Sequence, residues 1–209
     1  MLMPACLQGF TSLASKRGRN GLNTCSRMTE PTVLILPGWQ GSGTDHWQSH
    51  WERAYGYTRV EQHDWQRPLR GDWIARLEDV LLACEEPAVL VAHSLGCIHV
   101  AAWAAHSKNT HRVKAALLVA PPDTEREDLR QVLPGWSPVA LKALAFPSVV
   151  FASQNDPFCS PLRARHFATA WGAGYLDAGE GGHLNAESGL GSWPRAHTEL
   201  LRLTALPST

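Results

Sequence analysis

The chain has 209 residues, which is the size of a single domain with at most a short extension. Its 19 Lys and Arg side chains are balanced by 19 Asp and Glu side chains, so it lacks the positive surplus with which nucleic-acid-binding proteins displace counterions. No stretch reaches the roughly 18 consecutive apolar residues that a membrane-spanning helix needs. We therefore expect neither a nucleic-acid partner nor a membrane-spanning segment.

The five cysteines form no C-x-x-C pair, which indicates neither a zinc site nor a disulfide framework. A reducing, cytoplasmic location is the simplest expectation. Among the ten histidines, His46 and His50 have the i, i+4 spacing of two ligands on one helix face. No third ligand or general base accompanies them, so we expect no metal ion and no organic cofactor.

The chain is predicted to have two unequal parts. Residues 1–29 contain four basic side chains, no acidic one and no hydrophobic period. Their apolar residues precede the basic cluster, which is the reverse of a secretory signal, although the composition weakly resembles a transit peptide. We predict a disordered extension over residues 1–29 and one domain over residues 30–209, which is then mildly acidic.

From residue 32 onward, short apolar runs alternate with amphipathic segments, a pattern typical of βα units on a parallel sheet. The runs are continuously apolar, as expected for strands that helices cover on both faces. Strands are predicted at 33–36, 88–92, 115–119, 148–152 and 174–176. Helices are predicted from Asp72, as N-cap, to just before Pro87, and at 95–105, 161–171 and 195–203. The segment 121–147 is less regular, with one short charged helix.

One predicted strand leads directly into a motif typical of a nucleophilic serine. The strand at 88–92 continues into A-H-S-L-G and then into a predicted helix. Such a turn lifts the Ser94 hydroxyl clear of the sheet, where a base and a substrate can both reach it. The flanking positions must be small: Gly96 fits, and Ala92 replaces the usual glycine. The alternative is a serine that only caps the helix.

Two later loops supply an acid and a histidine in the order of a Ser, acid, His triad. Asp156 follows the strand at 148–152, and Pro157 prevents that strand from continuing. His183 lies in the glycine-rich loop G-E-G-G-H-L-N, where no apolar period assigns it to the core. We predict that Ser94, Asp156 and His183 are the catalytic residues.

Other histidines and acids are weaker candidates. We expect His93 to point away from the side on which Ser94 lies. Three more histidines belong to predicted helices: His99, His106 and His197. For the acid, Asp123 also follows a strand and is the main competitor, whereas Asp177 is too near His183. The alternative for His183 itself is an exposed loop residue.

A Ser, acid, His triad acts together with two backbone N–H groups, which form an oxyanion hole. We assign one to Leu95, which follows the nucleophile, and the other to Trp39, in the loop P-G-W-Q-G-S-G after the first strand. Gly38 permits a close approach of that loop and is predicted, together with Trp136, to contact substrate. The loop lacks the signatures of a P-loop and of a dinucleotide site, so phosphate is not expected.

Five segments in this order resemble the small serine hydrolases of the retinoblastoma-binding protein 9 family: I-L-P-G-W, T-D-H-W-Q-S-H-W, V-A-H-S-L-G, N-D-P-F and G-G-H-L-N. The likeness covers about residues 31–205. It implies a compact α/β-hydrolase with little or no lid domain and with Ser94, Asp156 and His183 as its triad.

The expected reaction is cleavage of a small ester, thioester or amide through an acyl-enzyme on Ser94. Acyl transfer to an alcohol or amine is an alternative, because the same acyl-enzyme serves both reactions. A binding module with a vestigial triad is another, because a fold does not determine a function. Neither the natural substrate nor the oligomeric state is predicted.

The resemblance also draws attention to L-A-C-E-E at residues 82–86, which matches the L-x-C-x-E motif of retinoblastoma-binding proteins. That motif binds its partner in an extended form. Here we expect it to form the last turn of the helix that begins at Asp72, with Cys84 on the buried face. We therefore predict a chance match and no partner at this segment.

Overall fold

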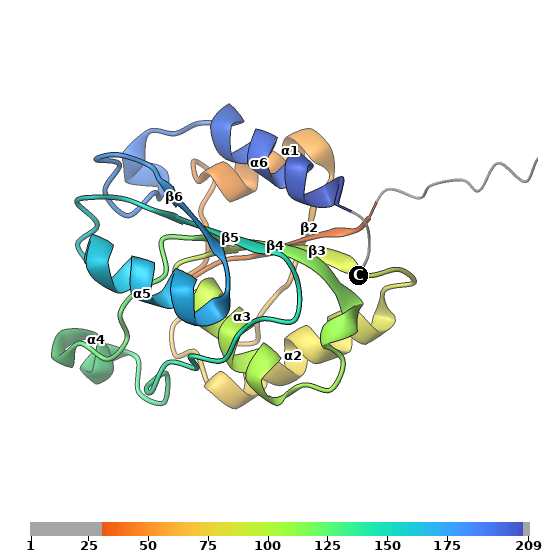
Figure 1. Ribbon diagram of the computed structural model, residues 1–209, viewed down its shortest axis with the longest axis horizontal. Coiled ribbons are helices and arrows are strands. Elements are labelled where there is room, and N and C mark those ends of the chain that lie inside the picture. Colours follow the sequence, from red (N-terminus) through yellow and green to blue (C-terminus); the bar gives the residue numbers. More distant parts are fainter. Residues whose placement is uncertain (1–30, 207–209) are drawn as a thin grey trace, which may run out of the picture. The chain divides into compact units, whose positions relative to one another are not determined.

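The computed structural model describes residues 31–206, and its centre is one parallel sheet (Figure 1). The six strands lie in the order β2-β1-β3-β4-β5-β6, and every neighbouring pair is parallel. They are β1 (Val33–Leu36), β2 (Thr58–Arg59), β3 (Ala88–His93), β4 (Val113–Val119), β5 (Ser148–Ala152) and β6 (Gly174–Asp177). The predicted extension over residues 1–29 lies outside the described residues.

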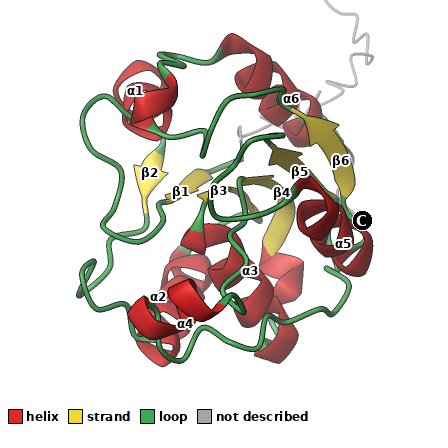
Figure 2. Cartoon of the chain, turned by 90° about the vertical axis from the view of Figure 1, so that its left-hand side faces the viewer, coloured by secondary structure: helices red, strands yellow, loops and turns green. Residues whose placement is uncertain are grey.

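Helices cover both faces of the sheet, as predicted (Figures 1 and 2). One face is covered by α1 (Trp47–Tyr55) and α6 (Pro194–Thr204). The other is covered by α2 (Arg70–Ala83), α3 (Leu95–His106) and α5 (Pro161–Trp171). The segment between β4 and β5 contains only the short helix α4 (Glu127–Val132), so the described residues include no lid domain.

The continuously apolar strands produce two cores. Successive side chains of a strand point to opposite faces, so Leu34 and Leu36 join the cluster under α2, α3 and α5, while Val33 and Ile35 join the cluster under α1 and α6. The side chains of β3 and β5 divide between the two clusters in the same way. Because neighbouring strands are all parallel, their carboxyl ends lie at one edge of the sheet, where the loops that follow them meet.

The predicted strands at residues 33–36 and 148–152 and the helix at 161–171 have the expected bounds, and the other predicted elements differ by one or two residues, with α2 as the exception. The prediction of Asp72 as N-cap is wrong. Helix α2 begins at Arg70, its N-cap is Leu69 without a side-chain hydrogen bond, and Asp72 lies in the first turn. There a carboxylate still stabilises the helix through its dipole.

One α-helix and one β-strand of the described residues had no prediction. Helix α1 is capped by His46, whose ring accepts the backbone N–H of Gln48, and Gly56 ends it in the left-handed region (φ 70°). Strand β2 has two residues on the edge of the sheet, which is too short for a sequence pattern.

The predicted helical setting of the L-x-C-x-E match is only partly right. Helix α2 ends at Ala83, with Cys84 as the C-cap, so the match lies across the end of the helix instead of forming its last turn. Leu82 is already 52% exposed, whereas Cys84 is half-buried and its thiol contacts the Val80 carbonyl oxygen at 3.3 Å. That no partner binds this segment stays a prediction.

None of the helices in residues 31–206 has the length and apolar character needed to cross a membrane.

Gly96 marks the closest approach of α3 to the loop after β1. A Cβ atom there would lie 2.3 Å from the Leu36 carbonyl oxygen and 3.0 Å from that of Pro37. We predict that Gly96→Ala lowers the free energy of unfolding by about 1–3 kcal/mol, because backbone must move to make room. Chemical denaturation measures this change.

Gly71 is the matched control, since it is also helical and a Cβ there has no neighbour within 4 Å. Gly71→Ala is expected to stabilise the protein by up to about 1 kcal/mol through helix propensity. Equal stabilities of Gly96→Ala and wild type would contradict the close packing at the start of α3.

Candidate active site

Ser94 occupies a strained turn between β3 and α3. Its backbone has φ 53° and ψ −126°, an unfavourable conformation for a residue with a side chain. The turn is held by hydrogen bonds from the Ser94 N–H to the Val119 carbonyl (2.9 Å) and from the Cys97 N–H to the Ser94 carbonyl (2.8 Å). This is the geometry of a nucleophile elbow, and it presents the Ser94 hydroxyl above the carboxyl edge of the sheet.

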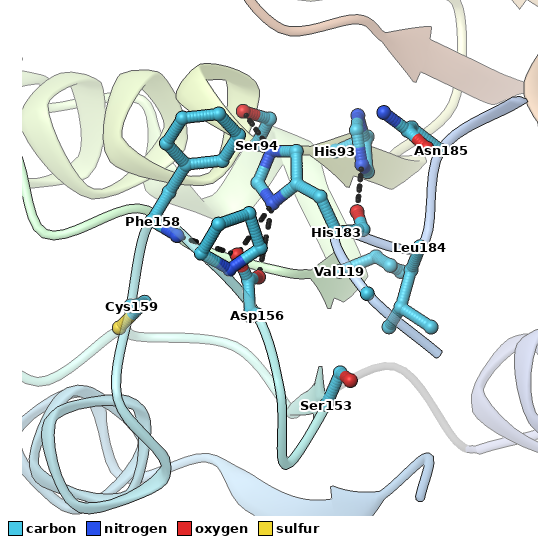
Figure 3. A network of polar contacts seen from close by, with 12 residues as sticks. His93, Ser94, Val119, Ser153, Asp156, Phe158, Cys159, His183, Leu184 and Asn185 are labelled. Atoms are coloured by element: carbon cyan, nitrogen blue, oxygen red, sulfur yellow. Dashed lines mark hydrogen bonds and ion pairs between the residues drawn. The ribbon is translucent and has the colours of Figure 1, made fainter. Parts of the chain in front are cut away.

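The structure brings the three predicted residues into one hydrogen-bonded chain (Figure 3). His183 Nε2 lies 2.8 Å from Ser94 Oγ, and His183 Nδ1 lies 3.0 and 2.9 Å from the two oxygens of Asp156. The side chains of Asp156 and His183 are only 3% and 9% exposed. Because a carboxylate only accepts, Nδ1 carries the proton and Nε2 is free to accept the serine proton.

The acid loop and the histidine loop are tied together by hydrogen bonds from backbone N–H groups of one loop to side-chain oxygens of the other. The Gly181 N–H donates to Ser153 Oγ (3.0 Å) and the Gly182 N–H donates to Asn155 Oδ1 (2.7 Å). Asp156 itself also accepts the Phe158 N–H at 2.9 Å. The distance between Asp156 and His183 is therefore also set by contacts between the two loops and does not depend on the His183 ring alone.

The rival acids have other partners. Asp123 lies 3.2 Å from Arg163 Nε in an ion pair, and its backbone N–H donates to the Phe158 carbonyl. Asp177 accepts hydrogen bonds from the Gly179 N–H and from Gln154. Of these three carboxylates, Asp156 is the one that contacts His183.

The loop after β1 lies directly against the nucleophile. A Cβ atom on Gly38 would be 2.6 Å from Ser94 Cβ and 3.1 Å from Ser94 Oγ, so no larger residue fits without movement. Among the turn and loop hydrogen bonds of residues 31–206, the backbone N–H groups of Gln40 and Gly41 have acceptors, whereas those of Trp39 and Leu95 have none. The predicted oxyanion-hole donors are thus beside Ser94 without a backbone acceptor.

Trp136 does not contact this site, contrary to the prediction that it lines the substrate pocket. Its side chain is fully buried and its indole N–H donates to the Pro68 carbonyl at 2.8 Å. The ring packs edge-on against Trp73, with 5.4 Å between centroids. The irregular segment 121–147 thus places this ring in the core.

A cavity of about 600 Å³ adjoins the base. Its lining residues are Pro157, Phe158, Glu180, Gly181, Gly182, His183, Asn185, Glu187 and Ser188. The Phe158 ring also contacts the His183 ring edge-on at 4.6 Å between centroids. Sequence reasoning did not identify Phe158, because an aromatic residue after Asp-Pro has no pattern that separates a core role from a site role.

Two buried histidines lie next to the triad and were not predicted to contribute to it. His93 does point away from the Ser94 hydroxyl, but its Nε2 lies 2.9 Å from the His183 carbonyl oxygen. Burial lowers the pKa of His93 well below its usual range and lowers that of His46 to about 3. Both rings are therefore neutral at physiological pH. The described part of the chain contains no group of three or more His, Cys, Asp or Glu side chains placed to hold a metal ion.

The nearby thiols are not competing nucleophiles. Burial raises the pKa of Cys159 to about 12 and that of Cys97 well above its usual range. A thiol is nucleophilic only as the thiolate, so neither group reacts at neutral pH. Of these three side chains, that of Ser94 is the one that lies within hydrogen-bonding distance of the His183 ring.

Comparison with known proteins identifies the family. The family described as Serine hydrolase matches residues 33–202. The chain belongs to this family. A crystal structure described as a YdeN-like hydrolase from Pectobacterium atrosepticum is 31% identical, with a TM-score of 0.74 over 84% of this chain and 91% of that chain. No curated protein is significantly similar in sequence.

Two more distant structures show the same fold. The ydeN gene product of Bacillus subtilis is 21% identical, with a TM-score of 0.70 over 84% of this chain and all of that chain. The carboxylesterase CesB of Bacillus subtilis is 15% identical, with a TM-score of 0.57 over 85% of each chain. The predictions of an α/β-hydrolase fold and of a serine hydrolase are thereby confirmed.

We predict that Gly38→Ala lowers kcat by about 100-fold or more, because the added methyl group displaces the Trp39 N–H relative to Ser94. Steady-state kinetics with an activated ester measures this. Gly43→Ala, in the same loop and without a neighbour within 4 Å of its Cβ position, should keep wild-type kcat. A fully active Gly38→Ala enzyme would contradict the assignment of this loop to the site.

Proposed function

We propose that this serine hydrolase cleaves a small ester, thioester or amide through an acyl-enzyme on Ser94, with His183 as general base and Asp156 as the residue that orients it. The observation that carries the proposal is the chain of hydrogen bonds from the Asp156 carboxylate through the His183 ring to the Ser94 hydroxyl. It needs no metal ion or organic cofactor.

In the first half of the reaction, His183 Nε2 takes the Ser94 proton while Oγ attacks the substrate carbonyl carbon. Throughout the reaction, Asp156 accepts a hydrogen bond from His183 Nδ1–H and stabilises the imidazolium. The Trp39 and Leu95 N–H groups bind the oxyanion of the tetrahedral intermediate. His183 then donates its proton to the leaving group, and the acyl-enzyme forms.

In the second half, His183 takes a proton from water, which attacks the acyl carbon and releases the acid product. The proton returns to Ser94 Oγ, so the enzyme is regenerated without a redox step. An alcohol or amine in place of water would make the same residues an acyltransferase. The choice between these acceptors depends on the cavity beside His183, where Phe158 and the Glu180 and Glu187 side chains lie.

Two observations favour an enzyme over a binding module on the same fold. The strained backbone of Ser94 costs of order 1–3 kcal/mol, which a vestigial site has no reason to retain. The ring of His183 is also held at hydrogen-bonding distance on both of its nitrogens. Two of the structural neighbours are described as carboxylesterases, which supports an ester as the first substrate to test.

The same proposal includes membership of the narrower retinoblastoma-binding protein 9 family, a cytoplasmic location and a small acyl substrate as partner. The L-x-C-x-E match at residues 82–86 has no part in it. A pull-down that is unchanged by Cys84→Ala would separate any retinoblastoma-protein binding from this motif.

A panel of p-nitrophenyl esters, thioesters and aminoacyl amides tests the proposed reaction. Wild type is expected to turn over at least one class, and Ser94→Ala to lose several orders of magnitude in kcat while it keeps the wild-type unfolding temperature. Turnover by Ser94→Ala at the wild-type rate would refute the nucleophile. Product analysis in the presence of added alcohol distinguishes the two reactions: hydrolysis releases the acid, whereas acyl transfer forms a new ester with the alcohol.

The two candidate acids give a matched pair of variants. We predict that Asp156→Asn lowers kcat by about 10³–10⁴-fold, because an amide does not stabilise the Nδ1-protonated tautomer and the imidazolium. Asp123→Asn, which weakens an ion pair with Arg163, should change kcat less than about threefold. Kinetics on the same ester measures both, and a reversed order of the two effects would make Asp123 the catalytic acid.

A further inference from the structure

We propose that His93 is a positioning residue for the general base: together with Trp47 it holds the backbone on either side of Leu184 and so aims the His183 ring at Ser94. This inference rests on the proposed function of the triad and goes beyond it. Sequence reasoning set His93 aside, because its side chain points away from the nucleophile that it precedes.

The contacts are two buried hydrogen bonds to consecutive carbonyl groups. His93 Nε2–H donates to the His183 carbonyl oxygen at 2.9 Å (Figure 3). Trp47 Nε1–H donates to the Leu184 carbonyl oxygen at 2.8 Å. Both donors are nearly inaccessible to solvent, at 5% and 1% exposure. Water therefore does not substitute readily for either donor, and a carbonyl that loses its donor stays unpaired.

Between these carbonyls lies a backbone conformation that needs external support. Leu184 has φ 49°, in the left-handed region that residues with a branched side chain avoid. Such strain persists only where the surroundings determine the conformation more strongly than the residue's own preference. The Leu184 side chain is buried under α6, and His93 and Trp47 hold the peptide groups on both sides of it.

The arrangement links the base to the nucleophile through one dipeptide. Ser94 contacts the ring of His183, and its neighbour His93 contacts the backbone of the same residue. A shift of the elbow therefore moves both attachments of His183 together. Misplacement of a catalytic group by about 1 Å can cost roughly 100-fold in rate, so this double attachment bears directly on kcat.

The hydrogen bond to the His183 carbonyl determines which ring nitrogen of His93 carries the proton. A carbonyl oxygen only accepts, so His93 Nε2 must be protonated. The His93 ring packs edge-on against His46, at 4.6 Å between centroids, and contacts the His183 and Trp47 rings at 5.0 and 6.1 Å. His46 Nδ1 accepts the Gln48 N–H, so neutral His46 carries its proton on Nε2, and that buried atom has no hydrogen-bond partner.

Burial keeps His93 neutral, and the neighbouring histidines act in the same direction. Desolvation, followed by the nearness of His46 and of His183, lowers the pKa of His93. The neutral ring has a single N–H, and this N–H donates its hydrogen bond to the His183 carbonyl oxygen. His93 therefore acts as a fixed donor and does not exchange protons in the reaction.

Three variants separate positioning from packing. His93→Leu keeps much of the volume and removes the donor, His93→Gln supplies an amide donor in its place, and Trp47→Phe removes the second donor from the neighbouring carbonyl. His99 supplies the matched control, because it is fully buried and its Nε2 donates to the Trp73 carbonyl at 2.7 Å, on the far side of the sheet in the α2/α3 layer. His99→Leu therefore removes the same kind of bond away from the triad.

We expect His93→Leu to lower kcat at least tenfold per folded molecule with KM changed less than threefold, His93→Gln to recover most of the loss, and Trp47→Phe to lower kcat by a smaller factor. His99→Leu should lower the unfolding temperature but leave kcat within twofold of wild type. Thermal unfolding of each variant gives the folded fraction by which rates are normalised.

A second readout does not depend on turnover. The proton between His183 Nδ1 and Asp156 should give a low-field proton NMR resonance in wild type and in Ser94→Ala, and this resonance should weaken or shift in His93→Leu and return in His93→Gln. Wild type without esterase activity but with this pattern of resonances would contradict the proposed function and support the positioning role.

The positioning role is overturned if His93→Leu keeps kcat within twofold of wild type with an unchanged resonance. It is also overturned if His99→Leu loses as much kcat per folded molecule, because the effect is then one of general packing. If His93→Leu does not fold, the His93→Gln and Trp47→Phe enzymes decide: a wild-type kcat and resonance in Trp47→Phe refute the role of the paired hydrogen bonds, and a loss of kcat at unchanged KM supports it.

Discussion

The tight turn at Ser94 is the constraint on which the rest of the site depends. A residue with φ 53° stands there only because β3 and α3 hold it from both sides. This turn also requires residues without a side chain beside it. A Cβ atom on Gly38 would clash with Ser94, and one on Gly96 would clash with the Leu36 carbonyl oxygen. The parallel sheet serves this turn by bringing the loops after β1, β5 and β6 to the same edge.

Buried tryptophan side chains attach several loops to the core around the sheet. Nine tryptophans outnumber the three tyrosines and five phenylalanines together, and the fully buried ones combine a large apolar ring with an N–H that needs an acceptor. Five of them donate to carbonyl groups in loops: Trp47 to Leu184, Trp51 to Ser192, Trp73 to Asp64, Trp136 to Pro68 and Trp171 to Ala140. Two of these bonds hold the loop that contains His183. The unusual composition is thus a property of the core more than of a substrate pocket.

Much of the fold and the triad could be predicted from the sequence, for physical reasons. Strands buried on both faces appear as unbroken apolar runs, and a nucleophile elbow needs small residues at fixed spacing, so β3 and Ser94 were both predictable. Helix α1 was not, because its cap is a histidine ring that accepts a backbone N–H. The burial of Trp136 and the contact of His93 with the His183 backbone depend on tertiary packing, which leaves no periodic signal in one sequence.

The central claim is that Ser94 is a nucleophile activated by His183. The most direct measurement is mass spectrometry of the protein after incubation with a fluorophosphonate, with the adduct mapped to a peptide. The account predicts one covalent adduct on Ser94, which is slowed strongly in His183→Ala and absent in Ser94→Ala. Folded wild-type protein that stays unlabelled, or an adduct on another residue that persists in Ser94→Ala, would contradict it.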